Sequence, residues 1–588
     1  MIAILTDKPS VGKEIGRIIG ATKVRNGYVE GNGYMVTWTF GNMLSLAMPK
    51  DYGTQKLERN DFPFIPSEFE LMVRHTRTEN GWIPDIDAVL QFKVIERVFQ
   101  ACDTIIAATD ASRDGEMTFR YVYQYLNCTQ PCFRLWISSL TDESVRKGME
   151  NLKPDSCYDS LFLSDSRNKA DWILGINASY AMCKATGLGN NSLGRVQTPV
   201  LAAISRRYRE RENHISSDSW PIYISLQKDG ILFKMRRTQD LPDKESATMF
   251  FQDCKLAHQA QITGISHSVK EILPPDLLDL TQLQKEANIR YGFTASEVYD
   301  IAQSLYEKKL ISYPRTSSRY LTEDVFDSLP PIMACLLSWE LFPAAKGTGG
   351  IDISNLSRHV ISAEKANVHH AIIITGIRPG NLSEKEMQVY RLVAGRMLET
   401  FMAPCRIETT NVEAVCAAQH FKAEQTRIIE AGWHDVFMRY DMIPTSGYSV
   451  KELPEVEKGD TLNVCGCNMV HKKELPVDPF TDAELVEYME LNGLGTVSSR
   501  TNIIRTLVNR KYIRYSGKYI VPTPKGMFTY ETIRGKKIAD TSLTADWEKQ
   551  LAGLESGMIT GQDFLNRIRT LAKEMTDDIF NTYSTKEE

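Results

Sequence analysis

The sequence lacks a long apolar run and a strong net charge. No uninterrupted apolar stretch is long enough to cross a bilayer, and 69 basic against 74 acidic residues leave a formal charge of only −5. The N-terminus, MIAILTDKPS, places Asp7 and Lys8 where a signal peptide needs apolar residues. These absences predict a cytoplasmic protein that does not bind a membrane. Because no global positive field exists, a nucleic-acid site must gather its Lys and Arg residues locally, in a groove or channel.

Disulfide frameworks, zinc ribbons and P-loops are also missing from the sequence. The 11 cysteines are odd in number and scattered along the chain, which suits a reducing compartment. Two close pairs, Cys128/Cys132 and Cys465/Cys467, have no second Cys or His pair at zinc-ribbon spacing, so free thiols are favoured over a metal site. No GxxxxGK[ST] motif occurs, which argues against an ATPase motor of the P-loop kind.

The composition is that of an ordinary globular protein, with 42% hydrophobic and 24% charged residues. At 588 residues the chain is too long for one core, and we expect about three to five domains. The apolar strand IAILT (2–6) is followed by a helix that opens at Pro9, and a helix at 92–102 precedes a buried strand at 103–110. This order predicts an α/β domain whose sites form at the carboxyl ends of parallel strands.

The rest of the chain divides into helical and β-rich stretches. Helical patterns cover about 155–215, 279–400 and the tail from about 478. The β-rich patterns cover about 218–270 and 405–475. Because a helical block separates the two β-rich stretches, we predict one β domain that the chain enters, leaves and re-enters.

Acidic residues follow two predicted strands of the α/β part. Carboxylates at the carboxyl ends of parallel strands make a hard oxygen site, which suits Mg²⁺. Lys8 and Arg113 lie beside these acids and are candidate phosphate ligands. The alternative is a solvated acidic loop without a ligand. The four acids are Asp7, after the first strand, and Asp110, Asp114 and Glu116 in the segment TDASRDGE.

A tyrosine is presented where a predicted helix ends. The segment 297–321 begins with one apolar helical face, and the helix must end before Pro314, which also favours an extended conformation at Tyr313. A tyrosyl oxygen can attack a phosphodiester as a covalent nucleophile, although its ordinary pKa of about 10 requires a nearby cation or base. Arg315 can supply that cation, lower the pKa of Tyr313 and bind two phosphate oxygens. The alternative is a tyrosine that only packs.

Three further motifs leave their roles open. Adjacent His369 and His370 precede a predicted apolar strand, and they fit phosphate binding, proton transfer or a plain surface pair. Arg195 and Gln197 precede a helix followed by several arginines, which is either a solvated face or a DNA-backbone contact. The stretch 481–526 reads as helix, turn, helix and hairpin, which suits a winged nucleic-acid module or a plain helical bundle.

The order of these motifs is more specific than any one of them. The segments DKPS, TDASRDGE, SLGRVQTPVL, DLLDLTQLQKEAN, ISYPRTSSRYL, HHAIIITG and GLGTVSSRTNII follow one another, and nearly the whole chain resembles a type IA DNA topoisomerase of the topoisomerase III kind. This resemblance implies a multidomain toroid with an α/β Toprim domain, two mainly helical domains and a β-rich arch. The implied domains are the Toprim domain at 1–152, a helical domain with a single-strand-binding segment and a winged-helix-like part at 153–215 and 478–588, the arch at 216–278 and 405–477, and a helical domain with the active-site tyrosine at 279–404.

The resemblance also implies an activity, a cofactor and partners. One DNA strand is expected to be cleaved through a 5′-phosphotyrosine bond, another strand passed through the gap, and the break religated without ATP, so that DNA is relaxed or decatenated. The expected substrates are single-stranded DNA and negatively supercoiled duplex DNA, with Mg²⁺ as cofactor, a helicase as a candidate partner and a monomer as the active form. The implied catalytic residues are Tyr313, Arg315, Lys8, Asp7 and His369; the implied metal ligands are Asp7, Asp110, Asp114 and Glu116; and the implied DNA-binding residues are Arg113, Arg167, Lys169, Ser192, Arg195, Gln197 and Arg500.

Departures from the family pattern concern the acids. The family usually has Glu where Asp7 stands, and its Asp-x-Asp-x-Glu triad reads Asp110, Ser112, Asp114 here. Asp7 is shorter by one methylene, about 1.5 Å, and Ser112 removes one metal carboxylate, so we expect weakened Mg²⁺ binding and poor religation. Two alternatives remain: a paralogue that binds single-stranded DNA with little or no turnover, and a winged-helix regulator built on 481–526.

Overall fold

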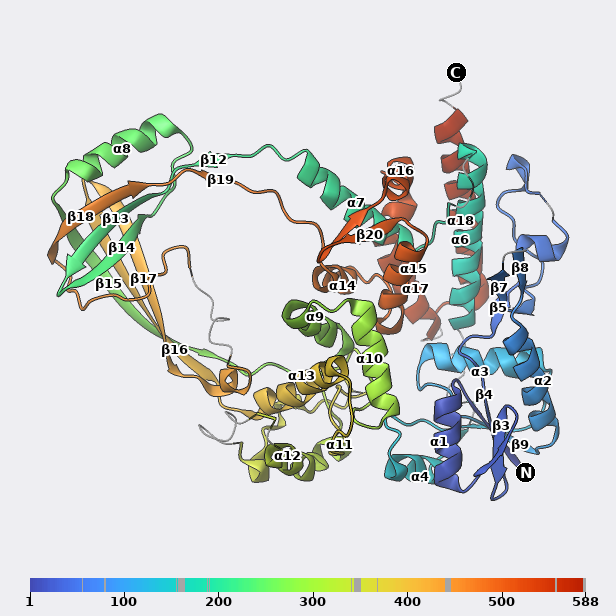
Figure 1. The fold of residues 1–588 in the computed structure, drawn as a ribbon. Coiled ribbons are helices and arrows are strands. Elements are labelled where there is room, and N and C mark those ends of the chain that lie inside the picture. The colour runs from blue at the N-terminus through green and yellow to red at the C-terminus, as the bar shows by residue number, and fades with distance from the viewer. Residues whose placement is uncertain are drawn as a thin grey trace.

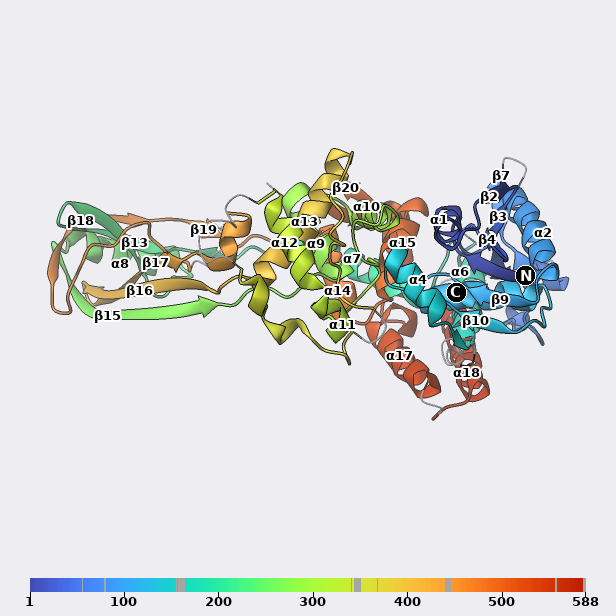
Figure 2. The same ribbon diagram turned by 90° about the horizontal axis from the view of Figure 1, so that it is seen from below.

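The structure is a computed structural model in which the chain follows a closed ring (Figure 1). Four parts make up the ring: an N-terminal α/β unit, a mainly helical unit that carries Tyr313, a β barrel, and a second helical unit. Seen from below, the barrel lies at one end of an elongated molecule and the α/β unit at the other (Figure 2). Among the described residues, no helix is both long and apolar enough to cross a membrane. The structure describes residues 1–54, 56–78, 81–154, 156, 164–187, 189, 191–339, 341–342, 351–366, 369–438, 446–555 and 558–584.

The N-terminal α/β unit alternates strands and helices. Its elements are β1 (Ile2–Thr6), α1 (Pro9–Ile19), β2 (Lys23–Arg25), β3 (Tyr28–Gly31), β4 (Tyr34–Trp38), β5 (Leu44–Leu46), β6 (Leu71–Val73), β7 (His75–Thr78), β8 (Gly81–Pro84), α2 (Ile86–Gln100), β9 (Thr104–Ala107), α3 (Arg113–Tyr125), β10 (Cys132–Arg134), α4 (Asp142–Glu150) and β11 (Lys153–Pro154). The main sheet has the order β11-β10-β9-β1-β4-β3-β2, in which β10, β9, β1 and β4 run parallel. The apolar sequence of β1 explains its central place, because both faces of a parallel strand are covered.

Two connections at the carboxyl edge of this sheet place the acids. β1 ends directly before Asp7 and Lys8, and α1 begins at Pro9, whose fixed φ suits a first helical turn. β9 leads into Asp110, and Ser112 caps α3 by accepting a hydrogen bond from the third amide of that helix. Because β1 and β9 are parallel neighbours, both connections lie at the same edge, as the sequence predicted.

The first helical unit presents Tyr313 in the irregular segment after α10. Its helices are α9 (Leu280–Tyr291), α10 (Ala295–Glu307), α11 (Glu323–Asp327), α12 (Leu329–Ser338) and α13 (Glu384–Phe401). α10 begins with a capping box formed by Thr294 and Glu297, which fixes its start. After this helix the chain turns at Lys309, whose φ of 62° is left-handed, and it continues as irregular backbone through Tyr313.

The prediction of an apolar strand after His369 is wrong. Within the described residues 369–376, the chain forms isolated bridges only: Ile372 pairs with Leu278, and Ile374 pairs with Ile311. The segment runs through the core of the helical unit, where Ile372 and Ile374 are buried. A short apolar run reads as a strand whenever it is buried, so the sequence pattern alone could not distinguish the two cases.

A closed barrel forms the part of the ring opposite the α/β unit (Figure 1). Its strands have the order β13-β14-β17-β16-β15-β18, so both β-rich stretches of the sequence contribute to it. Closure leaves no exposed strand edge in the barrel. The elements are β13 (Ile222–Lys228), β14 (Ile231–Arg237), α8 (Lys244–Leu256), β15 (Gln259–Ile272), β16 (Cys405–Cys416), β17 (Gln419–Glu430) and β18 (Thr461–Met469), with the connecting pair β12 (Asp218–Ser219) and β19 (Lys472–Lys473).

Two distant stretches of chain form the second helical unit. The elements are α6 (Ser164–Thr186), α7 (Gln197–Glu212), α14 (Asp482–Leu491), α15 (Val497–Asn509), β20 (Ile513–Ser516), β21 (Tyr519–Pro522), α16 (Pro524–Ile533), α17 (Thr541–Glu555) and α18 (Gly561–Ser584). α6 and α18 pack together around an apolar core that contains Trp547 and Phe564. The predicted helix, turn, helix and hairpin are present as α14, α15 and the β20–β21 pair. The multidomain ring predicted from the sequence is confirmed, whereas the residue boundaries of its domains stay predictions.

Candidate active site

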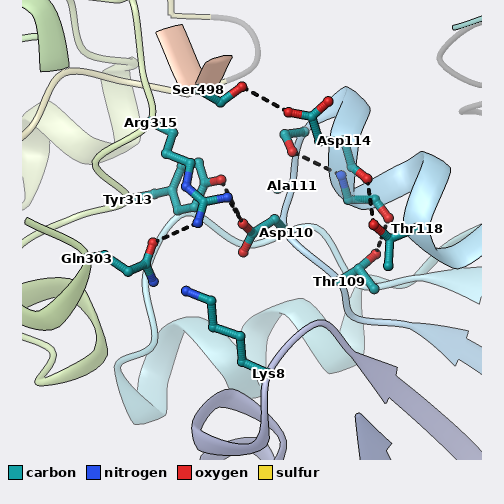
Figure 3. Close-up of polar contacts among 12 residues, drawn as sticks. Lys8, Thr109, Asp110, Ala111, Asp114, Thr118, Gln303, Tyr313, Arg315 and Ser498 are labelled. Atoms are coloured by element: carbon teal, nitrogen blue, oxygen red, sulfur yellow. Dashed lines mark hydrogen bonds and ion pairs between the residues drawn. The ribbon is translucent and has the colours of Figure 1, made fainter. Parts of the chain in front are cut away.

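Tyr313 lies at the seam between the α/β unit and the first helical unit (Figure 3). Its amide donates a hydrogen bond of 3.0 Å to the carbonyl of Ser138, across the seam. Only 2% of Tyr313 is exposed, and its ring centroid lies 5.4 Å from that of Tyr306 and 4.5 Å from that of His369. The hydroxyl nevertheless donates a hydrogen bond of 3.1 Å to Asp110 Oδ2. The tyrosine is covered, but its reactive oxygen lies beside the acids and not in an apolar interior.

Arg315 shares the Asp110 carboxylate with Tyr313. The Nη1 atom of Arg315 lies 2.5 Å from the same Asp110 Oδ2 (Figure 3). Burial and the negative charge of Asp110 raise the pKa of Tyr313 well above its ordinary range, and the positive charge of Arg315 lowers it by less. Arg315 thus lowers the pKa of Tyr313 as expected, but burial and Asp110 outweigh the guanidinium, so that the net shift of the pKa is upward. Tyr313 is a neutral phenol here.

Asp7 is a buried carboxyl close to Asp110. Its Oδ1 atom has no hydrogen-bond partner among the described residues. Burial, followed by the negative charge of Asp110, raises the pKa of Asp7 to about 7, against the opposing effects of Lys8 and Arg315. The carboxyl is therefore only partly ionised at neutral pH, unlike an ordinary aspartate.

A chain of polar contacts connects Lys8 to Arg315. Lys8 Nζ donates a hydrogen bond to Glu307 Oε1, and Ser10 Oγ donates one to Glu307 Oε2, both at 3.1 Å. Gln303 Nε2 donates to Glu307 Oε1 at 2.9 Å, and Gln303 Oε1 accepts from Arg315 Nη2 at 3.0 Å. Lys8 and Ser10 belong to the α/β unit and the other three residues to the helical unit, so this chain of contacts bridges the seam. Figure 3 shows its end, the contact between Gln303 and Arg315.

His369 lies against the tyrosine ring as an uncharged group. Its Nε2 contacts the carbonyl of Ala111, which can only accept, so this nitrogen carries the proton. Its Nδ1 lies 3.4 Å from Ser138 Oγ, and its ring stacks on Trp136. Burial lowers the pKa of His369 to about 4. The structure thus brings His369 to the tyrosine, as the sequence led us to expect, but as a neutral imidazole.

The other acids of TDASRDGE point in different directions. Asp114 Oδ2 accepts a hydrogen bond of 2.9 Å from Ser498 Oγ, at the start of α15 (Figure 3). Glu116 is buried and lies 3.2 Å from Arg134 and 3.0 Å from Arg120, in ion pairs with both. Because this segment is helical, side chains two positions apart diverge by about 200° around the axis. The sequence interpretation treated it as a loop and missed this divergence, although a serine followed by two acids is a helix-start signal.

The structure does not gather the four predicted metal ligands into one group. Among the described residues, no three His, Cys, Asp or Glu side chains are placed to hold a metal ion. Asp7 and Asp110 influence each other directly, Asp114 is bonded to Ser498, and Glu116 faces the interior. The side chain of Glu116 is thus committed to an internal ion pair, and its assignment as a metal ligand is the least supported of the four.

Two predicted DNA-binding arginines are buried, Arg195 inside the second helical unit and Arg500 where this unit meets α9. Arg195 is buried and pairs with Asp171 at 2.8 Å and with Glu548 at 3.1 Å. Arg500 is buried and donates to Thr281 Oγ1 at 3.0 Å. A guanidinium held in this way cannot meet a DNA strand without losing its partners, so neither side chain is exposed as the prediction required.

The remaining predicted basic contacts are closer to the surface. Arg167 lies 3.3 Å from Glu548, and Lys169 lies 2.6 Å from Asp165, each in an ion pair. Both partners are weak competitors for a polyanion, because ion pairs near the surface contribute little. The side chain of Arg113 lies outside the described part of the structure.

Arg510 is a functional candidate that the sequence analysis missed. It is exposed, and its Nη1 donates to Ser192 Oγ at 2.6 Å and to Gln197 Oε1 at 3.0 Å. Ser192 and Gln197 are therefore joined to a cation that comes from the far end of α15. Gln303 and Glu307 were missed as well; their spacing of four residues on the helix before Tyr313 was the available signal.

The second helix of the winged-helix-like part is not free to enter a DNA groove. α15 packs against α7 and α10, and Arg505 lies 2.8 Å from Asp300 of α10. Its first turn contacts Asp114 through Ser498. A recognition helix needs one uncovered face, so the packing does not support the alternative of a winged-helix regulator.

Comparison with known proteins identifies the family to which this geometry belongs. Residues 2–140 match the Toprim domain family, and residues 160–566 match the DNA topoisomerase family. The chain is 32% identical to DNA topoisomerase 3 of Bacillus licheniformis, over 98% of this chain and 81% of the relative. It is 31% identical to DNA topoisomerase 3 of Bacillus subtilis, over 99% of this chain and 82% of the relative. The chain belongs to the type IA DNA topoisomerases, of the topoisomerase III kind.

A solved structure shares the fold of this topoisomerase. The full-length topoisomerase I from Thermotoga maritima superposes with a TM-score of 0.72 at 21% identity, covering 98% of this chain and 90% of that chain. Family membership confirms the predicted class of activity, a strand-passing isomerase. Nothing in these comparisons supports the alternative of a paralogue without turnover.

Proposed function

We propose that Tyr313 is the nucleophile that cleaves one DNA strand, forming a 5′-phosphotyrosine bond and leaving a free 3′-hydroxyl. The observation that carries this proposal is the shared carboxylate: the Tyr313 hydroxyl and Arg315 both bind Asp110 Oδ2, where β1 and β9 end. A hydroxyl next to a proton acceptor and a phosphate-binding guanidinium is the arrangement that covalent attack requires.

Proton transfers follow from the positions of the two acids. As the Tyr313 oxygen bonds to phosphorus, its proton passes to Asp110, and the bond between phosphorus and the 3′-oxygen breaks. The leaving 3′-oxygen takes a proton from Asp7, the acid whose pKa is raised. Arg315 and Lys8 balance the charge of the phosphate, and religation reverses each transfer. The neutral His369 packs against the tyrosine ring and orients it.

Mg²⁺ is the cofactor that we propose for religation. The donors are hard oxygens, and the buried Oδ1 of Asp7, without a hydrogen-bond partner among the described residues, is an atom that a cation would satisfy. Asp7 and Asp110 would hold the ion, and Asp114 would join them only on leaving Ser498; the ion would supply positive charge for the reaction. Ser112 offers a hydroxyl where a carboxylate would bind more strongly, so we expect weakened affinity. Glu116 acts on the site only indirectly, by stabilising the α/β unit through its ion pair with Arg134.

We propose that single-stranded DNA approaches along the face where the α/β unit meets α6. A cavity of about 840 Å³ there is lined by Asn42 and by the aromatic side chains Trp82, Trp172 and Tyr180. Bases can stack on such side chains with little sequence preference. The exposed Arg510 of the second helical unit is the cation that we propose for a phosphate of the same strand.

The finer features of the substrate and of the cellular setting are also proposals. A region of single strand is easiest to open in negatively supercoiled duplex DNA, so we propose this form as the substrate and a helicase as the partner that exposes the strand. We propose that the enzyme acts as a monomer, because its ring is closed by one chain. We also propose the cytoplasm as its compartment and keep the domain boundaries predicted from the sequence.

The nucleophile is tested by trapping the covalent adduct. The wild-type chain is incubated with a 3′-labelled single-stranded oligonucleotide, with and without Mg²⁺, and quenched with alkali. We expect label attached to protein, which Tyr313→Phe abolishes. Tyr306→Phe, in the ring that packs 5.4 Å away, retains the adduct. An adduct that survives Tyr313→Phe, or that carries a label from the 5′ end of the oligonucleotide, contradicts the proposal.

A further inference from the structure

Both cations that the proposed function gives to the phosphate are already bound to carboxylates in this structure. Arg315 lies 2.5 Å from Asp110, and Lys8 lies 3.1 Å from Glu307. Asp110 has a proposed part in the reaction, whereas Glu307 has none. The position of Glu307 therefore needs a separate explanation.

Helix stability does not explain Glu307. It is the last residue of α10, whose last turn contains no basic residue. A negative charge at the carboxyl end of a helix opposes the helix dipole and is unfavourable there. The same carboxylate also lies at the amino-terminal end of α1 in the α/β unit, where it binds Lys8 and Ser10. The first turn of α1 contains no acid of its own. An amino-terminal helix end favours an anion.

We infer that Glu307 is a positioning residue that occupies the place of a DNA phosphate while the enzyme is free of DNA. The Oε1 atom of Glu307 accepts hydrogen bonds from Lys8 and Gln303, and its Oε2 atom accepts one from Ser10. Through Gln303 the same contacts reach Arg315, so Glu307 holds both phosphate-binding cations in place. An incoming phosphate displaces the carboxylate from Lys8 and Ser10. The Glu307 carboxylate and the DNA phosphate thus compete for the same cation. This inference rests on the proposed function, because it takes Lys8 to bind the phosphate.

A second ion-pair cluster on the same seam provides a matched comparison. Lys309 of the helical unit lies 2.5 Å from Glu14 and 3.0 Å from Asp142 of the α/β unit. The side chains of Lys309 and Glu14 are 20% and 24% exposed, close to the 27% of both Lys8 and Glu307. Removing Glu14 loosens the seam in a similar way, but it does not free a cation that the proposal gives to the phosphate.

The test measures single-stranded DNA binding in the Tyr313→Phe background, which cannot form the ester. We expect Glu307→Gln to tighten binding about three- to tenfold, because Lys8 no longer has a competing carboxylate. The slope of log affinity against log salt should stay the same, because Lys8 contacts the phosphate in both complexes and only the competing carboxylate is removed. Glu307→Asp, which keeps the charge, should restore the original affinity. Glu14→Gln should leave the affinity at the value of the background protein.

Two results overturn the inference. One is a Glu307→Gln protein whose affinity for single-stranded DNA is unchanged. The other is equal tightening by Glu14→Gln, since loosening of the seam and not release of Lys8 would then be the cause. Thermal melting of each variant checks that the fold is kept. Failure of the proposed function is recognised separately: the wild-type chain would form no 5′ adduct, a result that does not depend on any binding difference between the Glu307 variants.

Discussion

Replacing Glu116 by Gln decides whether this acid is structural or a metal ligand. The substitution removes the negative charge between Arg134 and Arg120 in the α/β unit, where the side chains of Arg134 and Glu116 are 2% and 1% exposed. Removing one partner of a buried ion pair costs about 3–5 kcal/mol, because the other charge is left uncompensated. Arg134 keeps hydrogen bonds to the carbonyls of Ala107 and Asp110. We therefore expect the free energy of unfolding to fall by the lower end of this range, about 3 kcal/mol.

Calorimetry in the absence of metal measures this loss. A change of 1 kcal/mol shifts Tm by about 2–4 °C for a unit of 150–250 residues, so the transition of the α/β unit should fall by about 6–12 °C. Asp114→Asn is the matched control, because Asp114 is an exposed acid of the same helix bonded to Ser498. This control should melt within about 1 °C of the wild type and instead raise the Mg²⁺ concentration that religation needs.

One pattern of results would refute the structural role of Glu116. The Glu116→Gln protein would melt with the wild type in the absence of metal, and it would need several-fold more Mg²⁺ for religation. Glu116 would then be a ligand that turns outward when the ion binds, and the pair with Arg134 would contribute little to stability.

Two other substitutions test the metal site and the path of the strand. Ser112→Asp should lower the Mg²⁺ concentration for half-maximal religation about three- to tenfold without loss of stability, because Asp caps a helix as well as Ser while adding a carboxylate; an unchanged Mg²⁺ titration would argue against a metal site there. Arg510→Ala should weaken single-stranded DNA binding about fivefold and reduce the salt slope by about 0.7, measured by fluorescence anisotropy; weakening without any change of slope would show that Arg510 acts only by holding Ser192 and Gln197.

Local sequence features were sufficient to predict the centre of the site. α10 ends at Glu307, before Pro314 as the sequence predicted, and Tyr313 follows in irregular backbone. Asp7 and Asp110 follow short buried strands, and parallel strands bring such ends together. These predictions depended on neighbours in the chain and on one rule of sheet topology, and both act in the same way in any fold.

The roles of the surrounding charges could not be predicted in this way. Arg195 and Glu116 are charged residues in motifs, and the sequence predicted that each side chain faces solvent or binds a ligand. In the structure each forms an ion pair inside its unit. Glu307 carried no functional signal, yet it contacts Lys8, which lies 299 positions away in the sequence. The strength of a charge in a site depends on its burial and on its nearest opposite charge, and packing between distant segments sets both.

The sequence alone thus determined the α/β order, the presented tyrosine, the two strand-end acids and, through the order of its motifs, the family. Only the tertiary structure decided that Asp110 binds the tyrosine hydroxyl and Arg315 together, that burial raises the pKa of Asp7 to about 7, and that Glu116 faces inward. The physical reason is one of range. Steric and hydrophobic patterns act between residues that are close in the sequence. The electrostatic partner of a charged side chain instead depends on which distant segments pack against it.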